Sequence, residues 1–112
     1  NTLSIALALS LRLQSAGYET SIAGDAISGV FSALSIRPDL MLLDISMPAG
    51  NGFAVAERVG RQADAKIPII FLTASKQPGF RERALELGAA GYFEKPYEAE
   101  VLMTAVHQHL GA

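Results

Sequence analysis

The sequence contains no cysteine and no tryptophan, and only 18% of its 112 residues are charged. The lack of cysteine excludes a disulfide framework and any metal site built from thiolates. Nine basic residues against eleven acidic ones give a net charge of -2 without a basic stripe, which argues against nucleic-acid binding by this segment. Half of the residues are hydrophobic, so we predict a single domain over residues 1–112.

No hydrophobic run in the sequence is long enough to span a bilayer, and no membrane association is expected. The most apolar stretch, residues 3–13, looks like a signal-peptide core but has no basic leader and is interrupted by Arg12. We expect a buried amphipathic helix over residues 2–16, capped by Gly17. Its leucines recur at every fourth position, as Leu3, Leu7 and Leu11.

Extended and helical patterns alternate along the chain. Two continuous apolar segments, residues 39–44 and 67–73, are typical of strands buried on both faces of a sheet. Such strands separated by helices predict a parallel sheet with helices on both sides, in an open, doubly wound α/β domain. The expected strands are residues 18–24, 39–44, 67–73 and 90–96. The expected helices are residues 2–16, 25–35, 52–63, 78–87 and 98–110.

Three polar residues fall at one edge of this predicted sheet. Asp44 ends one strand, Thr73 ends the next, and Lys95 follows the last. Each has an ordinary structural explanation on its own, as a turn acid, a strand-end hydroxyl or a solvated lysine. Ligands of open α/β sheets bind beyond the carboxyl ends of the strands. The three residues together therefore predict a small site for an anionic ligand.

The motifs around these residues resemble response regulator receiver domains. LLDISMPAGNG (42–52) is similar to the phosphoacceptor loop of that family, IIFLTAS (69–75) to its fourth strand, and LGAAGYFEKPY (87–97) to its fifth. The order and spacing of the motifs also fit, and the resemblance covers nearly the whole chain. It implies a flavodoxin-like receiver fold and a phosphorylation-dependent signalling switch, not an enzyme that transforms a free substrate.

The resemblance implies a role for each site residue. Asp44 would accept a phosphoryl group from a histidine kinase or a phosphotransfer protein. Mg²⁺ would bind Asp44 and the backbone carbonyl of Ser46. Lys95 would pair with one phosphoryl oxygen and Thr73 would hydrogen-bond another, while the ring of Tyr92 would move inward as an aromatic switch.

Three further expectations follow from the resemblance. The bond between Lys95 and Pro96 is predicted to be cis, because family members commonly have it so and an X-Pro bond adopts that form at modest cost. A homodimer through residues 78–110 is a candidate assembly. A cytoplasmic location is implied, and the absence of cysteine fits it.

The sequence departs from the family at its start. It opens on Asn1, at residues that match those just after the family's first strand and the acidic pair ending that strand. One carboxylate and one carbonyl would hold Mg²⁺ poorly. Three explanations stay open: the chain is truncated at its N-terminus, a partner chain fills the gap, or the domain works without phosphorylation.

Two other functions compete with the switch. A pseudo-receiver would act only as a protein-interaction module, but the presence of Asp44, Thr73 and Lys95 argues against it. A mononucleotide- or flavin-binding domain of the same fold would need a phosphate loop. The visible loops, SMPAGNG and TASKQPG, do not have P-loop spacing.

Overall fold

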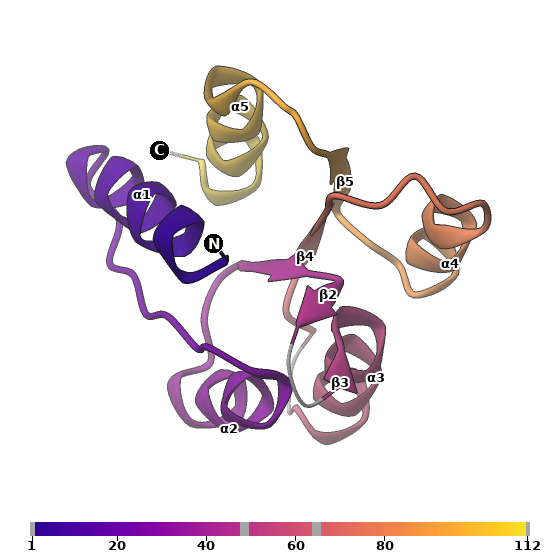
Figure 1. The fold of residues 1–112 in the computed structure, drawn as a ribbon. Coiled ribbons are helices and arrows are strands. Elements are labelled where there is room, and N and C mark those ends of the chain that lie inside the picture. Colours follow the sequence, from indigo (N-terminus) through magenta and orange to yellow (C-terminus); the bar gives the residue numbers. More distant parts are fainter. Residues whose placement is uncertain (1, 48–49, 64–65, 112) are drawn as a thin grey trace.

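The computed structural model describes residues 2–47, 50–63 and 66–111. Figure 1 shows helices arranged around a small central sheet. The elements are α1 (Thr2–Ser15), α2 (Ala26–Ile36), β1 (Met41–Asp44), β2 (Ser46–Met47), β3 (Gly50–Asn51), α3 (Gly52–Gln62), β4 (Ile69–Thr73), α4 (Phe80–Glu86), β5 (Gly91–Glu94) and α5 (Ala99–Leu110).

Three parallel strands form the main sheet in the order β1-β4-β5. Helices α3 and α4 make the two crossovers between them. Asp44 lies in register with Leu72, and Thr73 with Glu94, so the carboxyl ends of all three strands meet at one edge. A parallel sheet with helical crossovers is the predicted α/β architecture and is compatible with the flavodoxin-like fold.

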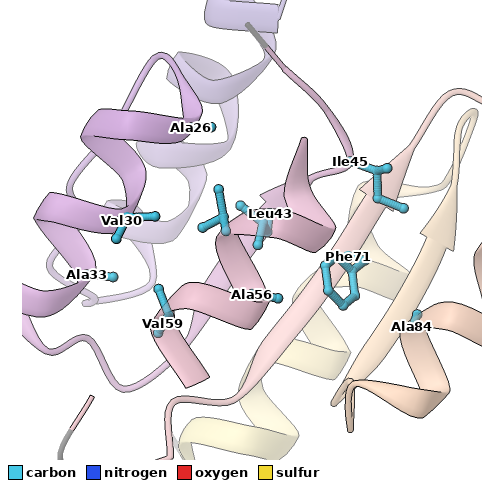
Figure 2. Packing of buried hydrophobic residues seen from close by; sticks show 10 residues of the cluster. Ala26, Val30, Ala33, Leu43, Ile45, Ala56, Val59, Phe71 and Ala84 are labelled. Atoms are coloured by element: carbon cyan, nitrogen blue, oxygen red, sulfur yellow. The ribbon is translucent and has the colours of Figure 1, made fainter. Parts of the chain in front are cut away.

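The larger group of buried side chains, the first cluster, packs helices α2, α3 and α4 against one face of the sheet (Figure 2). Leu43 of β1 and Phe71 of β4 supply the sheet side. The predicted contacts of α3 are confirmed, since Val55, Ala56 and Val59 are buried and Phe53 packs at the margin. The buried members are Ala26, Val30, Ala33, Leu43, Ile45, Val55, Ala56, Val59, Phe71 and Ala84.

A second cluster covers the opposite face of the sheet. Side chains alternate along a strand, so Ile70 and Leu72 point away from the face that carries Phe71. Leu102 and Val106 of α5 pack on them, and α1 and its following loop add partly buried residues. The sheet is therefore covered on both faces, which explains why its strands are apolar throughout.

Helix α1 is present as predicted, but it turns a different face to the core. Leu9 and Leu13 pack against the second cluster, and Ser10 is buried. Ser10 shares a 2.5 Å hydrogen bond with Thr20, which fixes this face toward the loop that follows the helix. The expectation that the leucines at every fourth position of this helix are buried is therefore wrong for Leu7 and Leu11. Leu7 is 50% exposed and Leu11 is 64% exposed.

Residues 18–24 do not form the predicted strand but run irregularly between α1 and α2. A strand is stabilised by pairing with a neighbour. In the described part of the chain, β1 has only one neighbouring strand, β4. No described strand lies on the other side of β1, so residues 18–24 have no strand with which to pair. The β propensity of this segment is therefore not expressed.

Local signals set the element ends. Asp25 caps α2 by accepting a 2.8 Å hydrogen bond from the Ser28 amide, as predicted. Gly17 follows α1 with a φ of 96°, a conformation that glycine adopts without strain. No helix in the described ranges is long and apolar enough to cross a membrane.

Candidate functional site

The structure brings Asp44, Thr73 and Lys95 to one edge of the sheet, as the sequence predicts. Asp44 is the last residue of β1, Thr73 is the last residue of β4, and Lys95 follows β5 directly. The Lys95 amide donates a 2.7 Å hydrogen bond to the Thr73 carbonyl, which extends the β4–β5 pairing to the site itself. The three side chains therefore start from a rigid, hydrogen-bonded strand edge.

Asp44 and Lys95 form an ion pair across this edge. The Lys95 Nζ lies 3.0 Å from Asp44 Oδ2, and the side chains are 21% and 17% exposed respectively. A pair that keeps partial solvent access can still meet a ligand from solution. The Lys95–Pro96 peptide bond, predicted to be cis, is cis in the structure.

The other oxygen of Asp44 is held by the loop that follows. Asp44 Oδ1 accepts a 2.9 Å hydrogen bond from the Ser46 amide, a local turn typical of aspartate. A hairpin unforeseen from the sequence, β2–β3, pairs Ser46 with Asn51 and returns the chain toward Asp44. Pro48 and its neighbour Ala49 lie outside the described residues.

The return of the chain places the last two residues of the LLDISMPAGNG motif, for which the sequence analysis predicted neither a helix cap nor a close approach to β1. Asn51 Oδ1 accepts a 2.9 Å hydrogen bond from the Ala54 amide and so caps α3. A Cβ on Gly52 would lie 2.6 Å from the Asp44 carbonyl oxygen, closer than real contacts allow. The Gly52 amide also donates a 2.9 Å hydrogen bond to the Ile45 carbonyl. An Asn-Gly pair before an apolar helix was the signal for both.

Thr73 is fully buried, and its hydroxyl is already engaged. Its Oγ1 accepts a 3.0 Å hydrogen bond from the Ser75 amide. A hydroxyl that reaches a ligand at the Asp44–Lys95 pair would therefore have to leave this amide or share it. Ala74, the residue between Thr73 and Ser75, is exposed.

Tyr92 lies on β5, half-buried against the first cluster. Burial raises the pKa of its phenol, and the negative charge of Glu94 raises it further. The Arg81 guanidinium from α4 lies 4.7 Å from the centre of the ring. Tyr92 is thus placed between the core and a surface cation. It has no hydrogen bond to Thr73 among those of the described residues.

The described residues supply only part of a magnesium site. They contain no group of three or more histidine, aspartate or glutamate side chains able to hold a metal ion. Asp44 would offer a carboxylate and Ser46 a carbonyl, whereas Mg²⁺ takes six oxygen ligands in near-ideal octahedral geometry. By themselves, these two residues do not fit the ion.

Comparison with curated proteins places this geometry in a family. The family model of the response regulator receiver domain matches residues 2–107. The transcriptional regulatory protein DltR of Streptococcus agalactiae is 41% identical over 103 residues, covering 92% of this chain and 46% of DltR. The DNA-binding response regulator MtrA of Mycobacterium tuberculosis is 36% identical over 107 residues, covering 96% of this chain and 46% of MtrA.

Solved structures agree. Vibrio cholerae chemotaxis protein CheY4 superposes with a TM-score of 0.82 at 29% identity, over 94% of this chain and 88% of that one. The receiver domain of the sensor histidine kinase PA1611 from Pseudomonas aeruginosa, described with magnesium in its active site cleft, gives a TM-score of 0.80 at 28% identity. It covers 98% of this chain and 88% of that one. The chain spans about half the length of DltR and MtrA. It belongs to the response regulator receiver domain family.

Proposed function

We propose that Asp44 is the phosphoacceptor of a phosphorylation-dependent signalling switch. The observation that carries the proposal is the ion pair of Asp44 with Lys95 at the carboxyl edge of the sheet, beside the strand end of Thr73. A carboxylate is a competent nucleophile toward phosphorus, and a cation beside it can bind the phosphoryl group that arrives. Receiver domains of this family act in two-component signalling.

The transfer step needs little covalent chemistry from the protein. An Asp44 carboxylate oxygen attacks phosphorus, an oxygen–phosphorus bond forms, and the nitrogen–phosphorus bond of a donor phosphohistidine breaks. The donor imidazole leaves with its electron pair and takes a proton from solvent. The product is an acyl phosphate on Asp44. Lys95 neutralises part of the phosphoryl charge as a mobile point charge.

The same step would rearrange the neighbouring side chains. Lys95 exchanges Asp44 Oδ2 for a phosphoryl oxygen. The Thr73 hydroxyl leaves or shares the Ser75 amide and donates a hydrogen bond to another phosphoryl oxygen. The Tyr92 ring follows into the space that this movement opens. The two arrangements give the switch its two states, and phosphorylation shifts the population between them.

Mg²⁺ is proposed as the cofactor only with ligands beyond Asp44 and Ser46. The ion usually keeps several waters and binds substrate phosphates together with one or two carboxylates. When bound, it would supply positive charge to the transferring group. Phosphorylation is proposed to depend on Mg²⁺, and Asp44 and Ser46 alone would hold the ion with low affinity.

The proposed partners are a histidine kinase or a phosphotransfer protein, in the cytoplasm, and a second copy through residues 78–110. Two large apolar side chains in that range are exposed, Leu85 at 70% and Val101 at 52%. Exposed apolar side chains mark a surface suited to protein contacts. The proposed module transforms no free substrate beyond its own phosphorylation and dephosphorylation.

Intact mass after incubation with acetyl phosphate and Mg²⁺ tests the proposal. The wild-type full chain is expected to gain one phosphoryl group, and Asp44→Asn is expected to gain none. Asp39→Asn is the matched control, because Asp39 is an exposed acid just before β1, at the opposite end of that strand. Its phosphorylation should equal wild type. A folded wild-type protein that gains no mass would leave the pseudo-receiver as the better account.

A further inference from the structure

One arginine of α4 touches both of the β5 side chains that face it. The guanidinium carbon of Arg81 lies 4.7 Å from the centre of the Tyr92 ring, and its Nη2 lies 3.5 Å from Glu94 Oε1. Tyr92 and Glu94 are two residues apart on a strand, so they share one face of the sheet. Arg81 therefore contacts both side chains from α4, on that face of the sheet.

The contact with Tyr92 has a preferred geometry. A guanidinium over the face of an aromatic ring is attracted by the electron density of the ring. The Tyr92 ring packs against the first cluster, which includes Ala84 of the same helix α4. The ring is therefore held by apolar contacts and by a cation. We expect an inward movement of the ring, away from α4, to break the contact with the cation. Glu94 keeps the cation in place by pairing with the guanidinium.

We propose that Arg81 is a positioning residue, which holds the Tyr92 ring beside α4 and thereby favours the unphosphorylated arrangement of the switch. The predicted effect of Arg81 on phosphorylation rests on the proposed function. An interaction that is present in only one of two states stabilises that state. Phosphorylation must therefore supply the free energy of this interaction before the other state is populated. Arg81 thus sets how readily Asp44 is phosphorylated.

The main test measures the initial rate of phosphorylation by limiting acetyl phosphate, using intact mass on the full chain. Exposed cation–π contacts are weak, so Arg81→Gln is expected to raise the rate by about two- to five-fold. In a Tyr92→Leu background, the same substitution should leave the rate close to that of Tyr92→Leu alone, because the ring that Arg81 holds is gone. An equal acceleration in both backgrounds would overturn the inference.

Arg83→Gln is the matched control for the loss of a positive charge from α4. Arg83 pairs with Glu57 at 3.0 Å and with Glu86 at 3.3 Å. Neither contact involves Tyr92. The control should leave the rate near wild type. If Arg83→Gln accelerates phosphorylation as much as Arg81→Gln, the effect belongs to the charge or the looseness of α4, and the positioning role fails.

A second measurement tests the contact between Arg81 and Tyr92 independently of phosphorylation. The ring current of Tyr92 should shift the side-chain proton resonances of Arg81 to lower frequency, and Tyr92→Leu should remove that shift. A wild-type chain with the shift but without phosphorylation contradicts the proposed function, and with it the effect of Arg81 on switching. A chain that is phosphorylated normally but lacks the shift contradicts the Arg81 contact alone.

Discussion

At the scale of single residues, the site depends on Gly52 as much as on its charged groups. The first turn of α3 passes so close to β1 that a Cβ on Gly52 would lie 2.6 Å from the Asp44 carbonyl oxygen and 2.9 Å from the Ile45 Cα. Both atoms belong to backbone that is fixed by the sheet and the hairpin. A side chain there can be accommodated only by moving the strand end that carries Asp44.

We therefore predict that Gly52→Ala lowers the free energy of unfolding by about 1–3 kcal/mol, the usual cost of overpacking. Gly60→Ala in the same helix has open space around it and should raise stability by about 0.5–1 kcal/mol. Urea unfolding of both variants measures the difference. A Gly52→Ala protein as stable as wild type would show that α3 can shift freely against β1.

Lys95 carries a second prediction at this scale. It is the cation that lies 3.0 Å from the Asp44 carboxylate. Removing one preorganised group that binds developing charge typically costs about 100-fold or more in rate. Lys95→Ala is therefore expected to slow phosphorylation by acetyl phosphate by about 100-fold. Lys66→Ala, at an exposed lysine outside the site, should leave the rate unchanged.

At the scale of the elements, α2 has a cap that titrates. The Ser28 amide and then the Ser28 hydroxyl donate to Asp25, and they hold the pKa of its carboxyl below the usual 3.8. A carboxyl with a lowered pKa in the folded state stabilises the fold above its unfolded value. That contribution is lost as the pH falls through the folded value.

Asp25→Ala is accordingly expected to be less stable than wild type at neutral pH, and the difference should narrow as the pH falls below about 3.8. Asp25→Asn is the control, because asparagine caps a helix equally well without titrating. Thermal unfolding followed by circular dichroism over a series of pH values measures both variants. A gap between wild type and Asp25→Ala that stays constant with pH would exclude the charge of Asp25 as its source.

The elements also show how far sequence reasoning reaches. Continuous apolar runs identified β1 and β4, because a strand covered on both faces has no polar positions. Caps at Asp25 and Gly17 located helix ends because they satisfy orphaned backbone groups locally. Residues 18–24 were placed in a strand wrongly, since β propensity is realised only when a partner strand is at hand. The hairpin β2–β3 is not predicted from the sequence, because each of its strands has only two residues.

The site shows the same division between local and tertiary information. The ends of predicted strands brought Asp44, Thr73 and Lys95 to one edge, because parallel strands share their direction. The closeness of Gly52 to Asp44 depends on how α3 returns to β1, and the contact of Arg81 with Tyr92 depends on where α4 lands. Neither follows from a pattern within one segment. Such contacts require the assembled fold.

At the scale of the whole molecule, two features favour self-association of the 112-residue chain by itself. In the part of the chain that the structure describes, β1 pairs on one side only, and an unpaired strand edge can pair with another chain. Large apolar side chains are also exposed on α2, with Ile27 at 68% and Phe31 at 72%. Packing against a second copy would remove these side chains from water and so favour association.

We predict concentration-dependent association of this chain in sedimentation velocity experiments at micromolar concentrations. The double variant Ile27→Ser, Phe31→Ser tests the face of α2. Association that disappears is attributable to the face of α2. Association that survives the substitutions is attributable to the β1 edge or to the surface proposed over residues 78–110, where Leu85 and Val101 are exposed. A monomer at every concentration would contradict the prediction for both.

The central place of β4 governs how the backbone exchanges hydrogen with solvent. It is paired on both sides, and Ile70 and Phe71 have no exposed surface. Their amide protons can reach water only when the sheet separates, which requires both clusters to come apart. The slowest exchange in the chain should therefore occur in β4 and should report the free energy of global unfolding. Amides of the seven-residue helix α4 should exchange through smaller local openings. The strand that ends at Thr73 would then mark the last part of the molecule to lose its structure.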